Sequence, residues 1–217
     1  MMGEIIKRFE SKKNSVFLVS VEGIMQVVKV HESEEKAYFE SEVLKRLYLY
    51  ANVPKVIKVE SNRIYMEYIE GKLAVDYFLE CDTEEVKELA RQMLSFCRVY
   101  SDQFDNFRLS DTNFRNFIVV EMDEEIELYG VDFEEREEGT LIKSAAELCA
   151  FSFLYDVDAY KKKTFYNTIA SNCSEQEVDF LNDYIFNSLN KLIKRRRLNL
   201  NVKSVFEELV IGNGHMV

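Results

Sequence analysis

The residues best suited to chemistry are Asp111 and Asn116, separated by four residues, and Asp132 further along the chain. Carboxylate and amide oxygens are hard ligands that suit Mg²⁺. A carboxylate can also orient a hydroxyl group and accept its proton. The order Asp-x4-Asn, an apolar run and then Asp-Phe matches phosphoryl transfer from a nucleotide, with Asp111 facing the attacking hydroxyl. Because Asp and Asn are also frequent in capped turns, Asp-x4-Asn alone is weak evidence.

The segments before these residues predict a small β-rich lobe. Alternating apolar residues indicate strands over 5–9, 16–19 and 24–30, arranged as an antiparallel meander. Ser33 is a suitable N-cap for a helix whose expected apolar face is Tyr38, Val43, Leu44 and Leu47. A hairpin over 56–59 and 63–68 completes a lobe of five strands and one helix.

The rest of the chain predicts a mainly helical lobe. Gly71 relieves backbone constraint after Glu70, so we expect two domains, 1–70 and 71–217. A long helix begins at Asp82 or Thr83, and another at Ser174, which forms a capping-box pattern with Glu177. A further helix is expected over 141–155, and a short hairpin over 117–120 and 126–129. The predicted class is therefore α+β and bilobal, with an antiparallel sheet and one helix first.

Taken in order, these features resemble the protein-kinase-like fold, and most closely its compact branch of aminoglycoside phosphotransferases, choline kinases, lipopolysaccharide-sugar kinases and small atypical protein kinases. The resemblance spans about residues 16–155. It implies that Lys29, in Val-Val-Lys-Val, contacts nucleotide phosphates, and that Glu40 pairs with this lysine. Glu42 is the rival partner, two residues further along the helix.

The same resemblance assigns the remaining roles. The backbone of Glu67, Tyr68 and Ile69 would bind adenine in an interlobe hinge. Asp111 would be the catalytic carboxylate, while Asn116 and Asp132 would hold magnesium. The implied cofactors are ATP and Mg²⁺, and the implied lobes are a nucleotide-binding lobe, 1–70, and a catalytic lobe, 71–217.

The chain departs from the family pattern in three places. Residues 11–15 contain no glycine where protein kinases carry a glycine-rich loop, although Lys12 and Lys13 could cover phosphates instead. Leu109, followed by Ser110, stands where a histidine is usual. Asp-Phe-Glu replaces Asp-Phe-Gly, as in the choline-kinase-like group. These departures keep a non-catalytic nucleotide-binding pseudokinase module as the alternative to an active enzyme.

The stretch between Glu134 and the helix near Leu141 is too short for the activation segment of a classical protein kinase. We therefore expect a kinase whose acceptor is a hydroxyl group of a small molecule such as a sugar, aminoglycoside or amino alcohol. An atypical protein kinase is the variant reading. The four glutamates of residues 134–138 could receive a cationic acceptor or form a solvated loop.

Composition narrows the class further. The net charge is −11, which argues against a nucleic-acid partner. The basic run Lys194–Arg197 suits the end of a helix, or alternatively a phosphate or substrate patch. The four cysteines lack a Cys-x-x-Cys pair, so no zinc site is expected. No membrane span and no signal peptide are apparent, and we expect a cytoplasmic protein.

Overall fold

The computed structural model describes residues 3–11, 13–123 and 125–210. The chain divides into two compact units. The first comprises Met1–Gly71 and Tyr129–Glu135, and the second comprises Lys72–Leu128 and Arg136–Val217. Antiparallel strands dominate the first unit and helices the second, so the predicted α+β class is confirmed.

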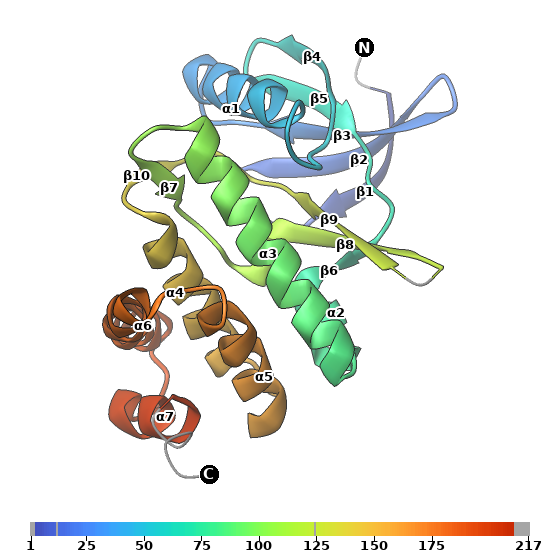
Figure 1. The fold of residues 1–217 in the computed structure, drawn as a ribbon. Coiled ribbons are helices and arrows are strands. Elements are labelled where there is room, and N and C mark those ends of the chain that lie inside the picture. Colours follow the sequence, from blue (N-terminus) through green and yellow to red (C-terminus); the bar gives the residue numbers. More distant parts are fainter. Residues whose placement is uncertain (1–2, 12, 124, 211–217) are drawn as a thin grey trace. The chain divides into compact units, whose positions relative to one another are not determined.

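The first unit is built on a five-stranded antiparallel sheet with the order β1-β2-β3-β5-β4 (Figure 1). Its strands are β1 Glu4–Phe9, β2 Ser15–Val21, β3 Ile24–Val30, β4 Val56–Glu60 and β5 Arg63–Glu67. The β2–β3 turn places Gly23 at a φ of +83°, a conformation that glycine adopts without a steric cost. The predicted meander and the later hairpin are both present, and β3 lies between β2 and β5.

The helix of the first unit, α1, spans Glu34–Leu47. Ser33 caps it as predicted, because its hydroxyl accepts a hydrogen bond from the Lys36 backbone N–H at 3.3 Å. The prediction that Tyr38 lies on the buried face is wrong, since Tyr38 is 63% exposed. The buried face contains Glu40 and Ser41 instead. Tyr38 precedes Glu40 by two residues, which turns its side chain roughly 200° away on a helix.

Helices form most of the second unit. They are α2 Ala74–Glu80, α3 Thr83–Gln103, α4 Leu141–Leu154, α5 Ala159–Ala170, α6 Glu175–Arg196 and α7 Val202–Leu209. The capping box predicted at Ser174 starts α6, and Asp82, one of the two expected starts, caps α3 with a capping box of its own. Helix α4 packs against α5 and α6, and α3 packs against α4 and α5 (Figure 1). No helix among the described residues has both the length and the apolar character needed to cross a membrane.

Five short strands follow, all in the second unit except for the last two residues of β9. They are β6 Lys72–Leu73, β7 Phe107–Leu109, β8 Phe117–Met122, β9 Glu125–Gly130 and β10 Arg136–Glu138. Strand β7 pairs with β10, whereas β6, β8 and β9 form a separate sheet. The loop between β7 and β8 contains Asp111 and ends in a 3₁₀ turn, η1 Phe114–Asn116. Both candidate residues of this segment therefore lie in a loop that two strands delimit.

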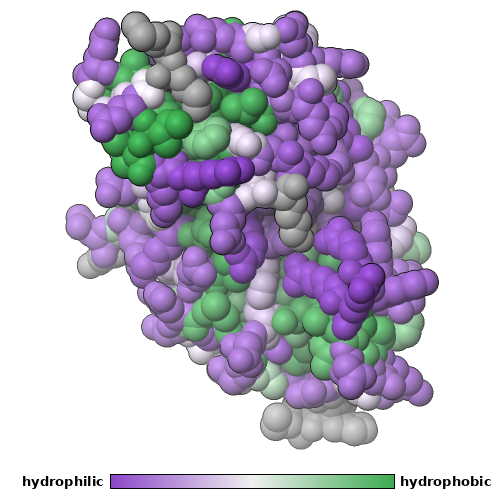
Figure 2. All heavy atoms as spheres, turned by 180° about the vertical axis from the view of Figure 1, so that it is seen from behind, coloured by the Kyte–Doolittle hydropathy of each residue, from purple (hydrophilic) through white to green (hydrophobic). Residues whose placement is uncertain are grey.

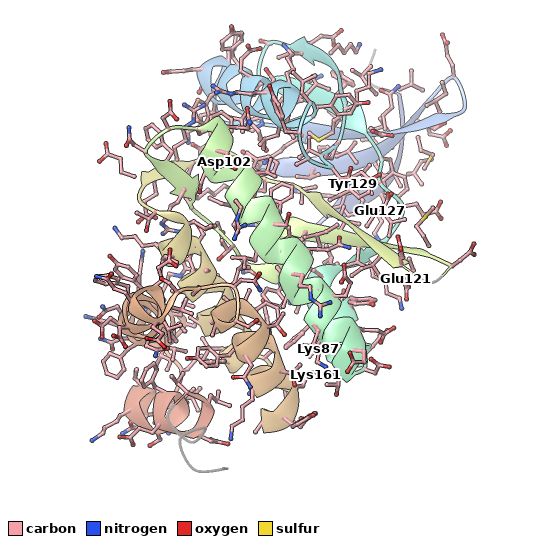
Figure 3. The ribbon with its side chains drawn as sticks, in the orientation of Figure 1. Lys87, Asp102, Glu121, Glu127, Tyr129 and Lys161 are labelled. Carbon is pink, nitrogen blue, oxygen red and sulfur yellow. The ribbon has the colours of Figure 1, made fainter. Side chains whose placement is uncertain are left out.

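Buried aromatic rings pack against the loop between β7 and β8. Phe114 is fully buried, and its ring centroid lies 5.3 Å from those of Phe78 and Phe165. Helix α2, which carries Phe78, has no basic residue in its last turn. Lys161 of α5 supplies that charge, because its Nζ donates to the carbonyl oxygens of Phe78 and Leu79 at 3.2 and 3.3 Å (Figure 3). This contact fixes α2 against α5 and so positions Phe78 against Phe114 of the loop.

The molecular face in Figure 2 is mostly hydrophilic, with local apolar patches, one of them beside the N-terminal strands. Large apolar side chains that are exposed in the first unit include Ile5, Ile6, Ile24 and Met25.

Candidate active site

The first unit gathers three carboxylates around one buried lysine. Lys29, on β3, is only 6% exposed. Its Nζ lies 2.9 Å from Glu40, 2.7 Å from Asp132 and 2.8 Å from Glu134. Burial alone would lower the pKa of Lys29, but the negative charges of the three carboxylates outweigh burial and raise it above its usual range. Lys29 is therefore a permanent cation within this cluster.

Glu40, and not Glu42, is the helix α1 residue that contacts Lys29. Glu40 is 1% exposed. Its Oε1 accepts hydrogen bonds from Lys29 Nζ at 3.0 Å and from the Phe133 backbone N–H at 2.9 Å, while Oε2 is the oxygen that lies 2.9 Å from Lys29 Nζ. Burial would raise the pKa of Glu40, but the charge of Lys29 and these hydrogen bonds lower it to about 2. Glu42 lies outside the cluster and pairs with Lys45 at 2.8 Å.

His31 is a member of this cluster that the sequence did not reveal. Its side chain is fully buried, and Nε2 lies 3.0 Å from Oε2 of Glu40. Possible ligand atoms of His31, Glu40 and Glu134 lie within 4.8 Å of one another, a spacing that would suit a metal ion. However, the ammonium of Lys29 already lies within hydrogen-bond distance of both carboxylates, so the cation of this group is the lysine. No local signal identified it, because β3 ends at Val30 and the contact of His31 with Glu40 is made through tertiary packing.

Asp132 has an unusual backbone conformation. Its φ of +71° is in the left-handed region, which costs a non-glycine residue energy and is concentrated at functional sites. Phe133 is buried, which anchors the segment. The Asp132 side chain is 45% exposed, so its carboxylate contacts Lys29 and still faces solvent. A carboxylate in this position can bind a hard cation from solution.

Side chains of the turn between β1 and β2 contact the segment that follows Asp132. Asn14 donates a hydrogen bond from Nδ2 to Glu134, and Lys13 pairs with Glu135. Lys13 therefore neutralises a carboxylate of its own unit. Lys12, the other lysine considered for a phosphate-covering role, lies outside the described residues.

The predicted adenine-binding stretch begins at the end of β5. The Glu67 backbone N–H donates to the Lys55 carbonyl at 2.9 Å and is therefore already used. Among the described residues, Tyr68 and Ile69 make no backbone hydrogen bond. Of the three predicted residues, Tyr68 and Ile69 keep both backbone groups available.

In the second unit, hydrogen bonds fix the conformation of the β7–β8 loop. The exposed carboxylate of Asp111 accepts the Asn113 backbone N–H at 3.1 Å. Asn116 Nδ2 donates to the Asp111 carbonyl at 3.2 Å, which leaves the amide oxygen of Asn116 for another partner. Asn113 Oδ1 accepts the hydroxyl of Tyr155, at the end of α4, at 3.1 Å. Asp111 and Asn116 are thus held in one turn, and no cation of residues 3–11, 13–123 or 125–210 pairs with the Asp111 carboxylate or the Asn116 amide oxygen.

Arg108, three residues before Asp111, is a second residue that sequence reasoning missed. It is buried, and its guanidinium contacts Glu137 of β10 at 2.7 Å and Glu147 of α4 at 3.1 Å. The same group donates to the carbonyl of Leu109 at 2.9 Å. Leu109, where the family resemblance calls for histidine, is buried and offers only its backbone. Arg108 therefore fixes the strand that leads into Asp111.

The comparisons with known proteins concern the fold. No protein-family model and no curated protein matches the chain. Among solved structures, WaaP in complex with acyl carrier protein is similar with a TM-score of 0.57 and 14% identity, over 95% of this chain and 90% of that one. The Rio2 kinase of Chaetomium thermophilum, as an ADP/Mg²⁺-phosphoaspartate complex, is similar with a TM-score of 0.59 and 14% identity, over 88% of this chain and 72% of that one. The chain therefore has a protein-kinase-like fold.

Proposed function

We propose that this protein is an ATP- and Mg²⁺-dependent phosphotransferase that acts on a hydroxyl group of a small molecule. The observation that carries the proposal is the cluster of Lys29, Glu40 and Asp132 in the first unit. A structural core has no need of a buried ammonium held by three carboxylates, since burying charges is costly. A half-exposed aspartate beside that ammonium suits the binding of Mg²⁺ and nucleotide phosphates.

Each residue has a defined role in this reaction. Lys29 binds phosphate oxygens of ATP, and Glu40 fixes the lysine. By the family resemblance, Asp132 of the first unit and the amide oxygen of Asn116 of the second are the residues that would hold Mg²⁺, which would neutralise charge on the phosphates. The backbone groups of Tyr68 and Ile69 are the donors and acceptors for adenine, with Glu67 limited to its carbonyl group.

Asp111 acts on the acceptor. Its carboxylate orients the acceptor hydroxyl and takes its proton while the hydroxyl oxygen forms a bond to the γ-phosphorus. The bond from that phosphorus to the bridging oxygen breaks, and ADP leaves with the electron pair. The exposed carboxylate of Asp111, whose one hydrogen bond within the described part of the chain is from the Asn113 N–H, is suited to this task.

The alternative function is a nucleotide-binding module without catalysis. It is favoured by the third carboxylate on Lys29, because Glu134 lies 2.8 Å from Nζ at a place where a phosphate oxygen would bind. ATP would have to displace Glu134 in an active enzyme. Leu109, in place of histidine before Asp111, points in the same direction.

The test is thermal stabilisation of the protein by ATP with and without Mg²⁺. A ligand that binds the native state raises its melting temperature by mass action. We expect Mg²⁺·ATP to stabilise the wild type and to lose most of this effect in Asp132→Asn, a substitution that tolerates the left-handed backbone. Asp105→Asn, at an exposed position of the second unit, is the control. The absence of any shift in the wild type at millimolar nucleotide would refute the proposal.

The variant Asp111→Asn distinguishes an active phosphotransferase from a non-catalytic nucleotide-binding module. An active phosphotransferase loses ADP release with its acceptor but keeps the stabilisation by Mg²⁺·ATP. A non-catalytic module shows the stabilisation and no ADP release in either form. Equal turnover by wild type and Asp111→Asn would disprove the role of Asp111.

A further inference from the structure

Two donors of the first unit meet at one carboxylate oxygen of Glu134. Oε1 of Glu134 lies 2.8 Å from Lys29 Nζ, on β3. The same oxygen accepts a hydrogen bond from Nδ2 of Asn14, a buried residue of the turn between β1 and β2. The Glu134 side chain therefore connects this turn to the lysine to which the proposed function assigns the phosphates of the nucleotide.

The surroundings of this oxygen would also suit a phosphate group. Carboxylate and phosphate oxygens are both anionic acceptors, and both bind ammonium and amide N–H donors. Asn14 is 8% exposed, and its backbone N–H donates to Ser11 Oγ at 3.4 Å, which helps to fix the turn. A phosphate oxygen that reached Lys29 and Asn14 would have to take the place of Glu134 Oε1.

Of the buried carboxylates on Lys29, Glu134 is the less strongly held. Burial raises the pKa of Glu134 above its ordinary value, the ammonium of Lys29 opposes that rise, and the charge of Asp132 adds to it. Burial acts in the same direction on Glu40, but there Lys29 and the hydrogen bonds prevail and lower the pKa to about 2. The ionised form of Glu134 is thus the one that its site disfavours.

The backbone around Glu134 does not oppose a movement of its side chain. Within the part of the chain that the structure describes, residues 131–135 form neither helix nor strand. Glu134 can leave Lys29 without the loss of a sheet or helix hydrogen bond. The ammonium would then keep the carboxylates of Glu40 and Asp132, at 2.9 and 2.7 Å.

We propose that Glu134 is an internal competitor of the nucleotide, and that a phosphate group displaces its carboxylate and takes over the donors Lys29 and Asn14. This inference rests on the proposed function, because it concerns the regulation of the same site. It adds Asn14 to the residues that bind phosphate. The displacement of Glu134 costs free energy, so the affinity for nucleotide is lower than Lys29 and Asn14 alone would provide.

The first experiment measures binding of inorganic pyrophosphate by isothermal titration calorimetry, without nucleotide or Mg²⁺, in about 0.15 M salt. We expect Glu134→Ala to bind pyrophosphate about tenfold more tightly than the wild type, because hydrogen bonds to charged groups no longer have to be exchanged. Glu135→Ala is the matched control. It removes the same charge one residue further along, from an exposed pair with Lys13, and should stay within about twofold of the wild type.

Three results would overturn the proposal: equal affinities of wild type and Glu134→Ala, an equal gain in Glu135→Ala, or no binding of pyrophosphate by Glu134→Ala. Circular dichroism checks that each variant is folded. Glu134→Gln, which keeps an acceptor for Asn14, provides the same comparison if Glu134→Ala does not fold.

This experiment is independent of the test of the proposed function. Pyrophosphate contains no nucleoside and is used without Mg²⁺, so the result can be obtained even if Mg²⁺·ATP fails to stabilise the protein. A failure of the proposed function appears in the thermal shift with Mg²⁺·ATP. A failure of the present inference appears in the comparison of Glu134→Ala with the wild type.

The second experiment tests Asn14 in the absence of its internal partner. In Glu134→Ala/Asn14→Ala the competitor is already removed, so the loss of the amide donor affects the anion alone. We expect pyrophosphate to bind this double variant about tenfold more weakly than Glu134→Ala. Glu134→Ala/Asn52→Ala, which removes an exposed asparagine of the same unit, should bind like Glu134→Ala. Equal affinities of the two double variants would disprove the role of Asn14.

Discussion

The substitution Glu40→Gln gives the most quantitative test of the Lys29 cluster. It keeps the shape of the side chain and removes its charge from a site that is 1% exposed. The pKa of Glu40 is lowered from its ordinary value of 4.5 to about 2. A difference of roughly 2.5 pH units corresponds to about 3 kcal/mol of stabilisation by the ionised form. We therefore expect Glu40→Gln to lower the free energy of unfolding by about 3 kcal/mol at pH 7.

The pH dependence of this loss has a definite sign. Because the folded-state pKa is depressed, the unfolded chain binds more protons between pH 2 and pH 4.5. The stabilisation is complete above pH 4.5 and declines as the pH falls toward 2. At pH 3, roughly 2 of the 3 kcal/mol should already be lost in the wild type, whereas the glutamine variant has no such loss.

The assay is urea unfolding followed by circular dichroism at pH 7 and pH 3, for wild type and variant. The stability difference between the two proteins should shrink by about 2 kcal/mol between these pH values. Glu42→Gln is the control, because Glu42 is exposed and an exposed ion pair contributes little. A difference that stays constant from pH 7 to pH 3, or an equal loss in Glu42→Gln, would refute the assignment of Glu40 as the stabilising partner of Lys29.

Two further predictions concern the second unit. Arg108→Met leaves the buried carboxylate of Glu147 without its cation and should lower the free energy of unfolding by about 3–5 kcal/mol. Chemical denaturation should show that the double variant Arg108→Met/Glu147→Leu recovers part of this loss. A double variant no more stable than Arg108→Met would contradict the pairing. Burial raises the pKa of the Cys97 thiol to about 12 and raises the pKa of the Cys149 thiol further. We therefore expect neither thiol to react with a thiol reagent at pH 8 in the native state, whereas the partly exposed Cys173 should react. Peptide mass spectrometry reports which thiols are labelled, and fast native labelling of Cys97 would show that its helix is not packed as described.

Sequence patterns predicted helices correctly where a local interaction determines the start of the helix. Ser33 and Ser174 cap the helices that they were expected to cap, and Asp82, expected as an alternative to Thr83, caps α3, because an N-cap side chain acts on neighbouring backbone groups. Tyr38 was assigned wrongly, because the helical stripe of Val43, Leu44 and Leu47 continues at Glu40, which is buried in its ion pair with Lys29.

The candidate site was predictable only where its residues form a motif. Lys29, Glu40 and Asp132 were found from their order in the chain, and the structure brings these three together. His31 and Arg108 could not be found in this way. Their roles depend on contacts with Glu40 and Glu147, which are distant in sequence, so only tertiary packing reveals them.

The first unit is assembled from two separate stretches of the chain, which limits how the gene can be divided for expression. Its sheet and helix come from residues before Lys72, but Asp132 and Glu134 come from a segment that returns to it after Leu128. A fragment ending at Gly71 would retain the five strands and yet leave the Lys29 ammonium with one of its three carboxylates. The smaller unit therefore cannot be excised as one continuous stretch, and a split protein must supply residues 129–135 in trans to complete the set of carboxylates around Lys29.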